Sequence, residues 1–142
     1  MGRSGTGLEG VFSAVLVSAS ACVTFLRRVR MRYCKDADAS HRRRWRLFAH
    51  SGHVRGRVCF ARAAAQELTP SEMVGMSAHE LGHVVADKLG LPAHVQSRYS
   101  RGKETPQSVQ DEADWVARHL FGIPIRYNKR TLQELDLDGR AG

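Results

Sequence analysis

Five consecutive residues, His79 to His83, have the types and spacing of a metal-dependent hydrolytic site. They read His-Glu-Leu-Gly-His. Residues four apart on a helix share a face, so His79 and His83 can bind one metal ion. Zinc accepts neutral imidazole nitrogen, and a catalytic zinc site keeps one position open for water. Glu80 follows the first histidine, where its carboxylate can take a proton from that water. The pentapeptide therefore predicts a Zn²⁺ site with Glu80 as the catalytic base.

The flanking residues predict a helix that carries this pentapeptide. Thr69-Pro70-Ser71-Glu72 is a capping box with proline at the first helical position, and Leu89-Gly90-Leu91-Pro92 is a stop signal. The alternative is a helix with two surface histidines and a solvated glutamate. The histidines share the apolar side of the helix, however, and burying an unpaired polar group there is costly. Gly82 lowers the helix propensity by about 1 kcal/mol against alanine, and it permits the close approach of another backbone or a substrate.

Length, charge and cysteine content set the broad class. A chain of 142 residues is expected to form one domain. The net charge of +8 is concentrated in the first fifty residues, which hold ten basic and three acidic side chains. Cys22, Cys34 and Cys59 form no Cys-x-x-Cys pattern, and no pair has metal-ligand spacing. This usage predicts a reducing, cytoplasmic compartment, and Cys59 is expected to be a small core residue.

Residues 1–44 are expected to form a basic extension, partly disordered or folded as a loosely packed helix. The apolar run at residues 11–26 is too short for a membrane span, and most of its positive charge follows it, unlike in a signal peptide. Association with a membrane is therefore not expected. We expect residues 1–30 to be dispensable for the fold, with Met31 as an alternative start. A flexible tail is expected at residues 136–142.

A basic run from Arg42 to Arg46, with Trp45 interleaved, has two interpretations. It can make a weak electrostatic contact with nucleic acid. It can equally be a solvated basic loop or strand edge, and no fingerprint of a nucleic-acid-binding module accompanies it.

Residues 45–135 are expected to form the main domain, of the α+β class. Alternating apolar residues at 45–61 predict a hairpin or small antiparallel sheet, and residues 91–104 predict a loop. Thr105-Pro106 opens a second helix that ends before Gly122. Its apolar stripe consists of Val109, Ala113, Val116, Ala117 and Leu120.

The pentapeptide and the later segment Glu112-Ala113-Asp114-Trp115-Val116-Ala117 together resemble the ImmA/IrrE-type zinc metallopeptidases, a compact branch of the gluzincins. The resemblance covers roughly residues 45–125. It implies a small zincin-like domain with an HExxH helix and a second ligand-bearing helix. It also implies bound Zn²⁺ and endopeptidase activity on a protein or peptide, such as a regulator or repressor.

The chain departs from the family at the third zinc ligand. The usual ligand position is an acidic residue, and here it holds Gln110, a poor zinc ligand beside Asp or Glu. On a helical wheel, Glu112 flanks one side of the apolar stripe, Gln110 and Asp114 flank the other side, and Asp111 faces away. We therefore expect Glu112 to be the third ligand, because of its longer reach, and Asp114 to support a ligand histidine. Asp114 is the next candidate for the ligand itself.

Two functions remain from the sequence. The first is a zinc-dependent endopeptidase, for which Arg98, Tyr99 and Arg101 are candidate stabilisers of the oxyanion. The alternative is a nucleic-acid-associated regulatory module with a degenerate or non-catalytic metal site. The other histidines, including His50 and His94, are expected to be surface or hydrogen-bonded structural residues.

Overall fold

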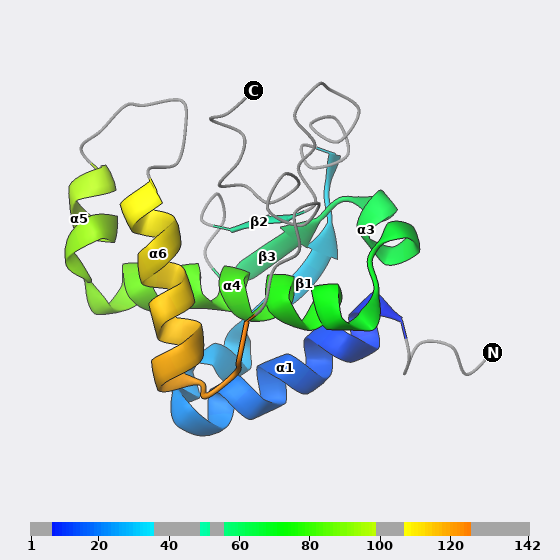
Figure 1. The fold of residues 1–142 in the computed structure, drawn as a ribbon, viewed down its shortest axis with the longest axis horizontal. Helices are drawn as coiled ribbons and strands as arrows, with labels where there is room; N and C mark the ends of the chain where they lie inside the picture. Colours follow the sequence, from blue (N-terminus) through cyan, green and yellow to red (C-terminus); the bar gives the residue numbers. More distant parts are fainter. Residues whose placement is uncertain (1–6, 36–48, 52–55, 99–106, 126–142) are drawn as a thin grey trace.

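The computed structural model describes residues 7–35, 49–51, 56–98 and 107–125, and in it a small sheet lies against helices (Figure 1). The sheet has three strands, β1 (Arg30–Tyr33), β2 (Ala49–Ser51) and β3 (Arg57–Phe60). The central strand β3 pairs antiparallel with β2 and parallel with β1. The α+β class and the antiparallel pair are confirmed. The sheet as a whole is mixed, because β1 pairs parallel with β3. Strand β1 comes from the segment that we expected to lie outside the domain.

The HExxH helix, α4 (Pro70–Leu89), begins and ends where the sequence predicts. Both hydrogen bonds of the capping box are present: the N–H of Glu72 donates to Thr69 Oγ1 at 3.2 Å, and the N–H of Thr69 donates to Glu72 Oε1 at 2.9 Å. Gly90 ends the helix with a φ of 69°, a left-handed conformation that glycine adopts without strain.

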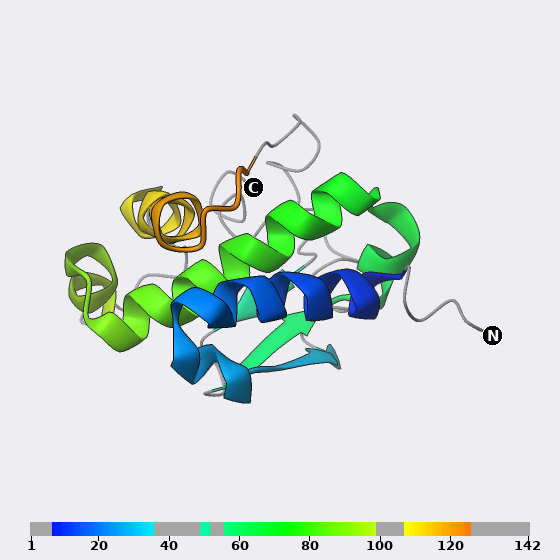
Figure 2. The same ribbon diagram turned by 90° about the horizontal axis from the view of Figure 1, so that it is seen from below.

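Helix α1 (Leu8–Cys22) is part of the core rather than a loose extension. Leu8, Phe12, Val15 and Ala19 recur on one face, and each is at most 6% exposed. This face lies along α4, as Figure 2 shows. The ring of Phe12 meets that of Phe60 on β3 edge to face, with centroids 6.0 Å apart. The expectation that residues 1–30 are dispensable thus conflicts with the packing, since their apolar face fills the space between α4 and the sheet.

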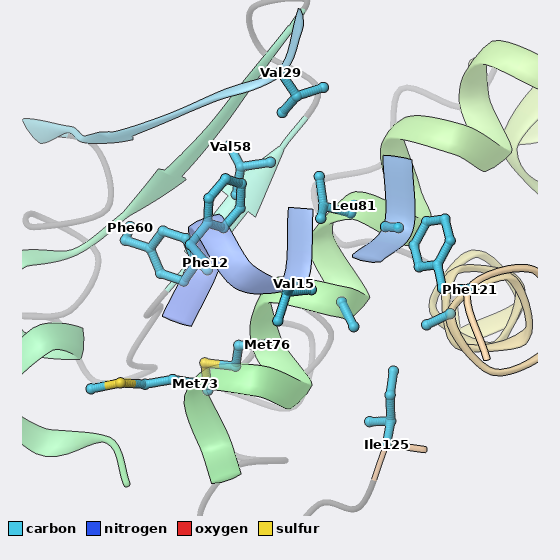
Figure 3. Packing of buried hydrophobic residues seen from close by; sticks show 14 of the residues in the cluster. Phe12, Val15, Val29, Val58, Phe60, Met73, Met76, Leu81, Phe121 and Ile125 are labelled. Atoms are coloured by element: carbon cyan, nitrogen blue, oxygen red, sulfur yellow. The ribbon is translucent and has the colours of Figure 1, made fainter. Parts of the chain in front are cut away.

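The core therefore combines residues from both sides of the expected boundary at residue 44. A 3₁₀ helix, η1 (Thr24–Arg28), joins α1 to β1 and buries Leu26. Figure 3 shows the core side chains gathered between α1, α4 and β3, among them Phe12, Val15, Val58, Phe60, Met76 and Leu81.

The remaining helices lie at the two ends of α4, one at its start and the others beside its C-terminal half (Figure 1). A short helix, α3 (Arg62–Glu67), precedes α4, and α5 (Pro92–Arg98) follows it. The predicted loop at residues 91–104 thus begins as a helix, because proline at the first helical position is compatible with helical geometry. Helix α6 (Gln107–Trp115) continues into a π-helical turn, η2 (Val116–Leu120). The predicted stripe is buried at Val109, Ala113, Val116 and Ala117.

Several predictions fall on residues outside those that the structure describes. They are the basic run from Arg42 to Arg46, the start of the second helix at Thr105-Pro106, and the tail at 136–142. The side chains of Arg98, Tyr99 and Arg101 also lie outside this part of the chain. Within the described ranges, every helix is either too short or too polar to span a bilayer.

Candidate metal centre

The candidate site depends on a close approach of α4 and α6 at Gly82. A Cβ atom at this position would lie 2.2 Å from the carbonyl oxygen of Ala113 and 3.0 Å from its carbonyl carbon. Any larger residue would therefore collide with the backbone of α6. Because the two backbones meet here, Gln110 and Asp114, on either side of Ala113 in the sequence, reach the imidazole ring of His79 on α4.

Three side-chain atoms converge beside α4. His79 Nε2 and His83 Nε2 lie 3.0 Å apart, and Gln110 Oε1 lies 2.9 Å from each of them. The two imidazole rings stand nearly perpendicular, with centroids 4.6 Å apart. His79 and Gln110 are fully buried, and His83 is 9% exposed. The i, i+4 spacing predicted from the sequence thus brings both histidines to one point, and α6 adds an amide oxygen to it.

The outer nitrogen of each histidine has its own partner. His79 Nδ1 lies 2.7 Å from Asp114 Oδ1, and since a carboxylate only accepts, the imidazole donates. His83 Nδ1 lies 2.9 Å from His94 Nε2, and His94 Nδ1 lies 2.6 Å from Glu112 Oε1. Glu112 thus selects the tautomer of His94 that accepts at Nε2, so that His83 donates from Nδ1. Such partners orient histidines that bind metals.

These tautomers leave three lone pairs facing one another. With both Nδ1 atoms protonated, the neutral rings of His79 and His83 present bare Nε2 atoms, and Gln110 presents its carbonyl oxygen. Three acceptors about 3 Å apart repel unless a proton or a cation lies between them. Two imidazoles and one oxygen are a donor set that zinc accepts, and a tetrahedral site places such atoms about 3.3 Å apart. The residues present therefore fit the metal that the sequence predicts.

The electrostatics of the two histidines differ. Burial lowers the pKa of His83 well below its ordinary value, and electrostatic interaction with the rings of His79 and His94 lowers it further. Burial also acts to lower the pKa of His79, but the hydrogen bond to Asp114 and the negative charge of Glu80 outweigh it, so this pKa is raised. His79 is therefore the ring of the pair that binds a proton more readily, and a proton on its Nε2 would compete with zinc.

The three acidic residues expected near the metal differ in what their carboxylates contact. The carboxylate of Glu112 accepts from the backbone N–H groups of Ala93 at 3.0 Å and His94 at 2.9 Å, in addition to the His94 ring. Glu112 as the third ligand therefore stays a prediction: its carboxylate faces α5, and the oxygen that lies beside both histidines is that of Gln110. Asp114 lies where a support for a ligand histidine is expected. Glu80 follows His79 on α4 and is fully buried.

A second group of metal-ligand types lies elsewhere, at Cys34, His50 and Cys59. Their ligand atoms all lie within 4.8 Å of one another, and this buried group could hold a metal ion. Sequence analysis missed it because the three residues are far apart along the chain and show no local spacing. One signal was present in the sequence: His50 and Cys59 both lie in the segment 45–61, which was predicted to form paired strands.

Comparison of the chain with protein-family models, curated proteins and solved structures finds no match. The resemblance to the ImmA/IrrE-type metallopeptidases therefore depends on the residues of two motifs, one on α4 and one on α6. The convergence of His79, His83 and Gln110 is an independent, geometric argument for a metal centre.

Proposed function

We propose that the chain is a zinc-dependent metallopeptidase whose metal is held by His79, His83 and Gln110. The observation that carries this proposal is the meeting of His79 Nε2, His83 Nε2 and Gln110 Oε1 within 3.0 Å, with Glu80 next to the first histidine. His79, Glu80 and His83 also carry part of the resemblance to the ImmA/IrrE-type enzymes, whereas Gln110 departs from it. The neutral amide of Gln110 compensates less of the metal's charge than a carboxylate does, so the proposed site binds zinc more weakly than the family's usual set.

Each side chain has a separate part in the proposed hydrolysis. A bound zinc supplies Lewis acidity, lowering the pKa of a water molecule and polarising the scissile carbonyl. Glu80 takes the proton of the attacking water and passes it to the leaving amine. Asp114 keeps the proton of His79 on Nδ1, so that Nε2 stays available as a ligand. Strand β2 forms one edge of the sheet, where an extended peptide can add by main-chain hydrogen bonds.

The amide of Gln110 also supports a second candidate, a buried hydrogen-bond network without catalysis. Rotating the amide by 180° exchanges its oxygen and nitrogen, and Nε2 then donates to both histidine lone pairs. This orientation would hold α4 to α6 with no cation. The complete burial of Glu80 and Gln110 favours such a closed, structural cluster as well. This candidate is the non-catalytic form of the alternative that the sequence left open.

Gln110→Glu separates the two candidates. A carboxylate is a better zinc ligand than an amide, so the metallopeptidase proposal expects the variant to bind zinc at least 10-fold more tightly. The network candidate expects the opposite, because a carboxylate cannot donate to two lone pairs. The buried group is then unsatisfied, which costs about 1–3 kcal/mol of stability or more. Gln66→Glu, a change of the same type at an exposed position of α3, is the control.

Activity is tested with Glu80→Gln and His79→Ala. Glu80→Gln keeps the ligands and removes the base, so zinc content should be unchanged while hydrolysis of a mixture of unfolded proteins falls by at least ~10²-fold. His79→Ala should lose both zinc and hydrolysis. Purified wild-type protein that contains no zinc and takes up none when it is added would refute the proposal. Equal hydrolysis by wild type and Glu80→Gln would remove Glu80 as the base.

A further inference from the structure

The three strands of the sheet bring Cys34, His50 and Cys59 to one face. His50 on β2 lies directly opposite Cys59 on β3 in the antiparallel register, so their side chains project from the same side. Cys34 follows β1, and its N–H donates to the carbonyl of Phe60 at 3.2 Å, which extends the pairing of β1 with β3. Each strand of the sheet, or the residue directly after it, thus contributes one side chain.

This face is the one turned away from the helices. Val58 and Phe60, the neighbours of Cys59 in β3, are fully buried in the core with Phe12 of α1 (Figure 3). Side chains alternate along a strand, so Cys59 projects to the opposite side of the sheet from both of them. Two of the three residues are nevertheless shielded from water, since Cys59 is 5% exposed and His50 is 6% exposed, while Cys34 is partly exposed. None of its residues belongs to the site on α4.

The distances suit a thiophilic metal. Cys34 Sγ lies 2.9 Å from His50 Nε2, and the three ligand atoms all lie within 4.8 Å of one another. A tetrahedral zinc site with two sulfurs and one nitrogen has ligand separations of about 3.5–3.8 Å, so the atoms need to move by about 1 Å or less. Two thiolates and an imidazole select Zn²⁺ over Mg²⁺ or Ca²⁺, which prefer oxygen ligands.

We propose that Cys34, His50 and Cys59 bind a structural zinc ion that holds the three strands together. Binding forms two Zn–S bonds and one Zn–N bond, leaves the fourth tetrahedral position to a water molecule, and releases the two thiol protons to solvent. The strands have only three or four residues each, so a metal ion bound to all three would add a cross-link to a short hydrogen-bonded ladder. The proposal is independent of the peptidase function, since it uses no residue of the α4 site.

The protonation of the thiols agrees with this assignment. Burial raises the pKa of Cys59 to about 11, and the neighbouring Cys34 adds to the shift. The thiol of Cys59 therefore stays protonated near neutral pH when no cation is present. A metal ion supplies the positive charge that makes two adjacent thiolates stable.

The test uses full-length protein loaded with Co²⁺ in place of zinc, because only a thiolate ligand produces a sulfur-to-cobalt charge-transfer band. We expect this band in wild type and in the double variant His79→Ala/His83→Ala, which lacks the α4 ligands. Cys34→Ser should lose the band and about one equivalent of zinc per chain. Cys22→Ser, at an exposed cysteine of α1, is the matched control and should keep both.

The outcomes distinguish this site from the proposed active site. Loss of the band in Cys34→Ser but not in the double histidine variant supports the Cys34–His50–Cys59 centre even if the peptidase proposal fails. Absence of the band from wild-type protein that is folded and reduced would overturn it, and this measurement does not depend on any variant folding. A Cys34–Cys59 disulfide in protein purified under reducing conditions would also overturn it.

Discussion

Replacing Gly82 by alanine tests whether the contact between α4 and α6 positions the metal centre. The added Cβ atom would lie 2.2 Å from the carbonyl oxygen of Ala113, whereas a relaxed C···O contact is about 3.3 Å or longer. Helix α6 must therefore move by roughly 1 Å at this point. Gln110 moves with it, and a metal site tolerates displacements of only about 0.2 Å in its ligand distances.

The expected effects on stability and on zinc binding differ in size. Overpacking typically costs about 1–3 kcal/mol, and alanine recovers about 1 kcal/mol of helix propensity relative to glycine. The net loss of stability of the metal-free protein should therefore be about 2 kcal/mol or less. The affinity for zinc should fall by ~10–100-fold or more, because both Gln110 and Asp114 are displaced from His79.

The assays are competition for zinc with a chromophoric chelator and urea unfolding of the metal-free protein. Asp87→Ala, at an exposed position of the same helix, is the control and should bind zinc as wild type does. Ala113→Gly should not rescue Gly82→Ala, because the colliding atoms belong to the backbone of Ala113 and not to its methyl group. A Gly82→Ala protein that is folded and has wild-type zinc affinity would refute this account of the site.

Three further predictions concern the surroundings of the site and the core. The folded-state pKa of Glu112 is lowered, since hydrogen bonds from the histidine ring and backbone of α5 outweigh burial. The ionised Glu112 therefore stabilises the fold above its unfolded pKa, and this stabilisation is lost as the pH falls through the folded pKa. Glu112→Gln should flatten the acid side of a plot of Tm against pH for metal-free protein. Asp114→Ala should weaken zinc binding by ~10–100-fold, whereas Asp111→Ala, at an exposed position, should leave the chelator competition unchanged. Phe12→Ala should lower the free energy of unfolding in urea by about 3–5 kcal/mol, against almost no change for the exposed Val17→Ala.

Local signals in the sequence were sufficient for α4. Its capping box, its glycine stop and the shared face of His79 and His83 depend on residues within one helix, and all appear as predicted. The role of Gly82 as a point of close approach was also predictable, because a glycine in a helix interior is otherwise unfavourable. Such features need no knowledge of distant parts of the chain.

The N-terminal helix shows where local signals are insufficient. Leu8, Phe12, Val15 and Ala19 have helical spacing, but Val11 and Leu16 beside this face and Val17 away from it are apolar too, so no clear stripe stands out. Val17 is 68% exposed, which shows that hydrophobicity alone does not identify the buried face. The positions of α4 and β3 decide which face of α1 is covered. These positions cannot be read from the sequence of residues 1–44, which is why this segment was assigned to an extension.

At the third ligand position, geometry and chemistry favour different residues. The helical wheel already placed Gln110 and Asp114 on one flank of α6, four residues apart, and the structure brings both to His79. Glu112 was preferred because a carboxylate is the better zinc ligand, yet its flank faces α5, where it binds the His94 ring and two backbone N–H groups. The direction in which a helix faces is determined by its closest contact, here Gly82 against Ala113, and a ligand's chemistry cannot alter it. A chain with an amide at the third ligand position therefore either binds zinc through that amide or uses it to hold two histidines by hydrogen bonds. Gln110→Glu replaces the amide by a carboxylate and leaves the backbone position on α6 unchanged. That single substitution therefore decides between a metal centre and a structural network.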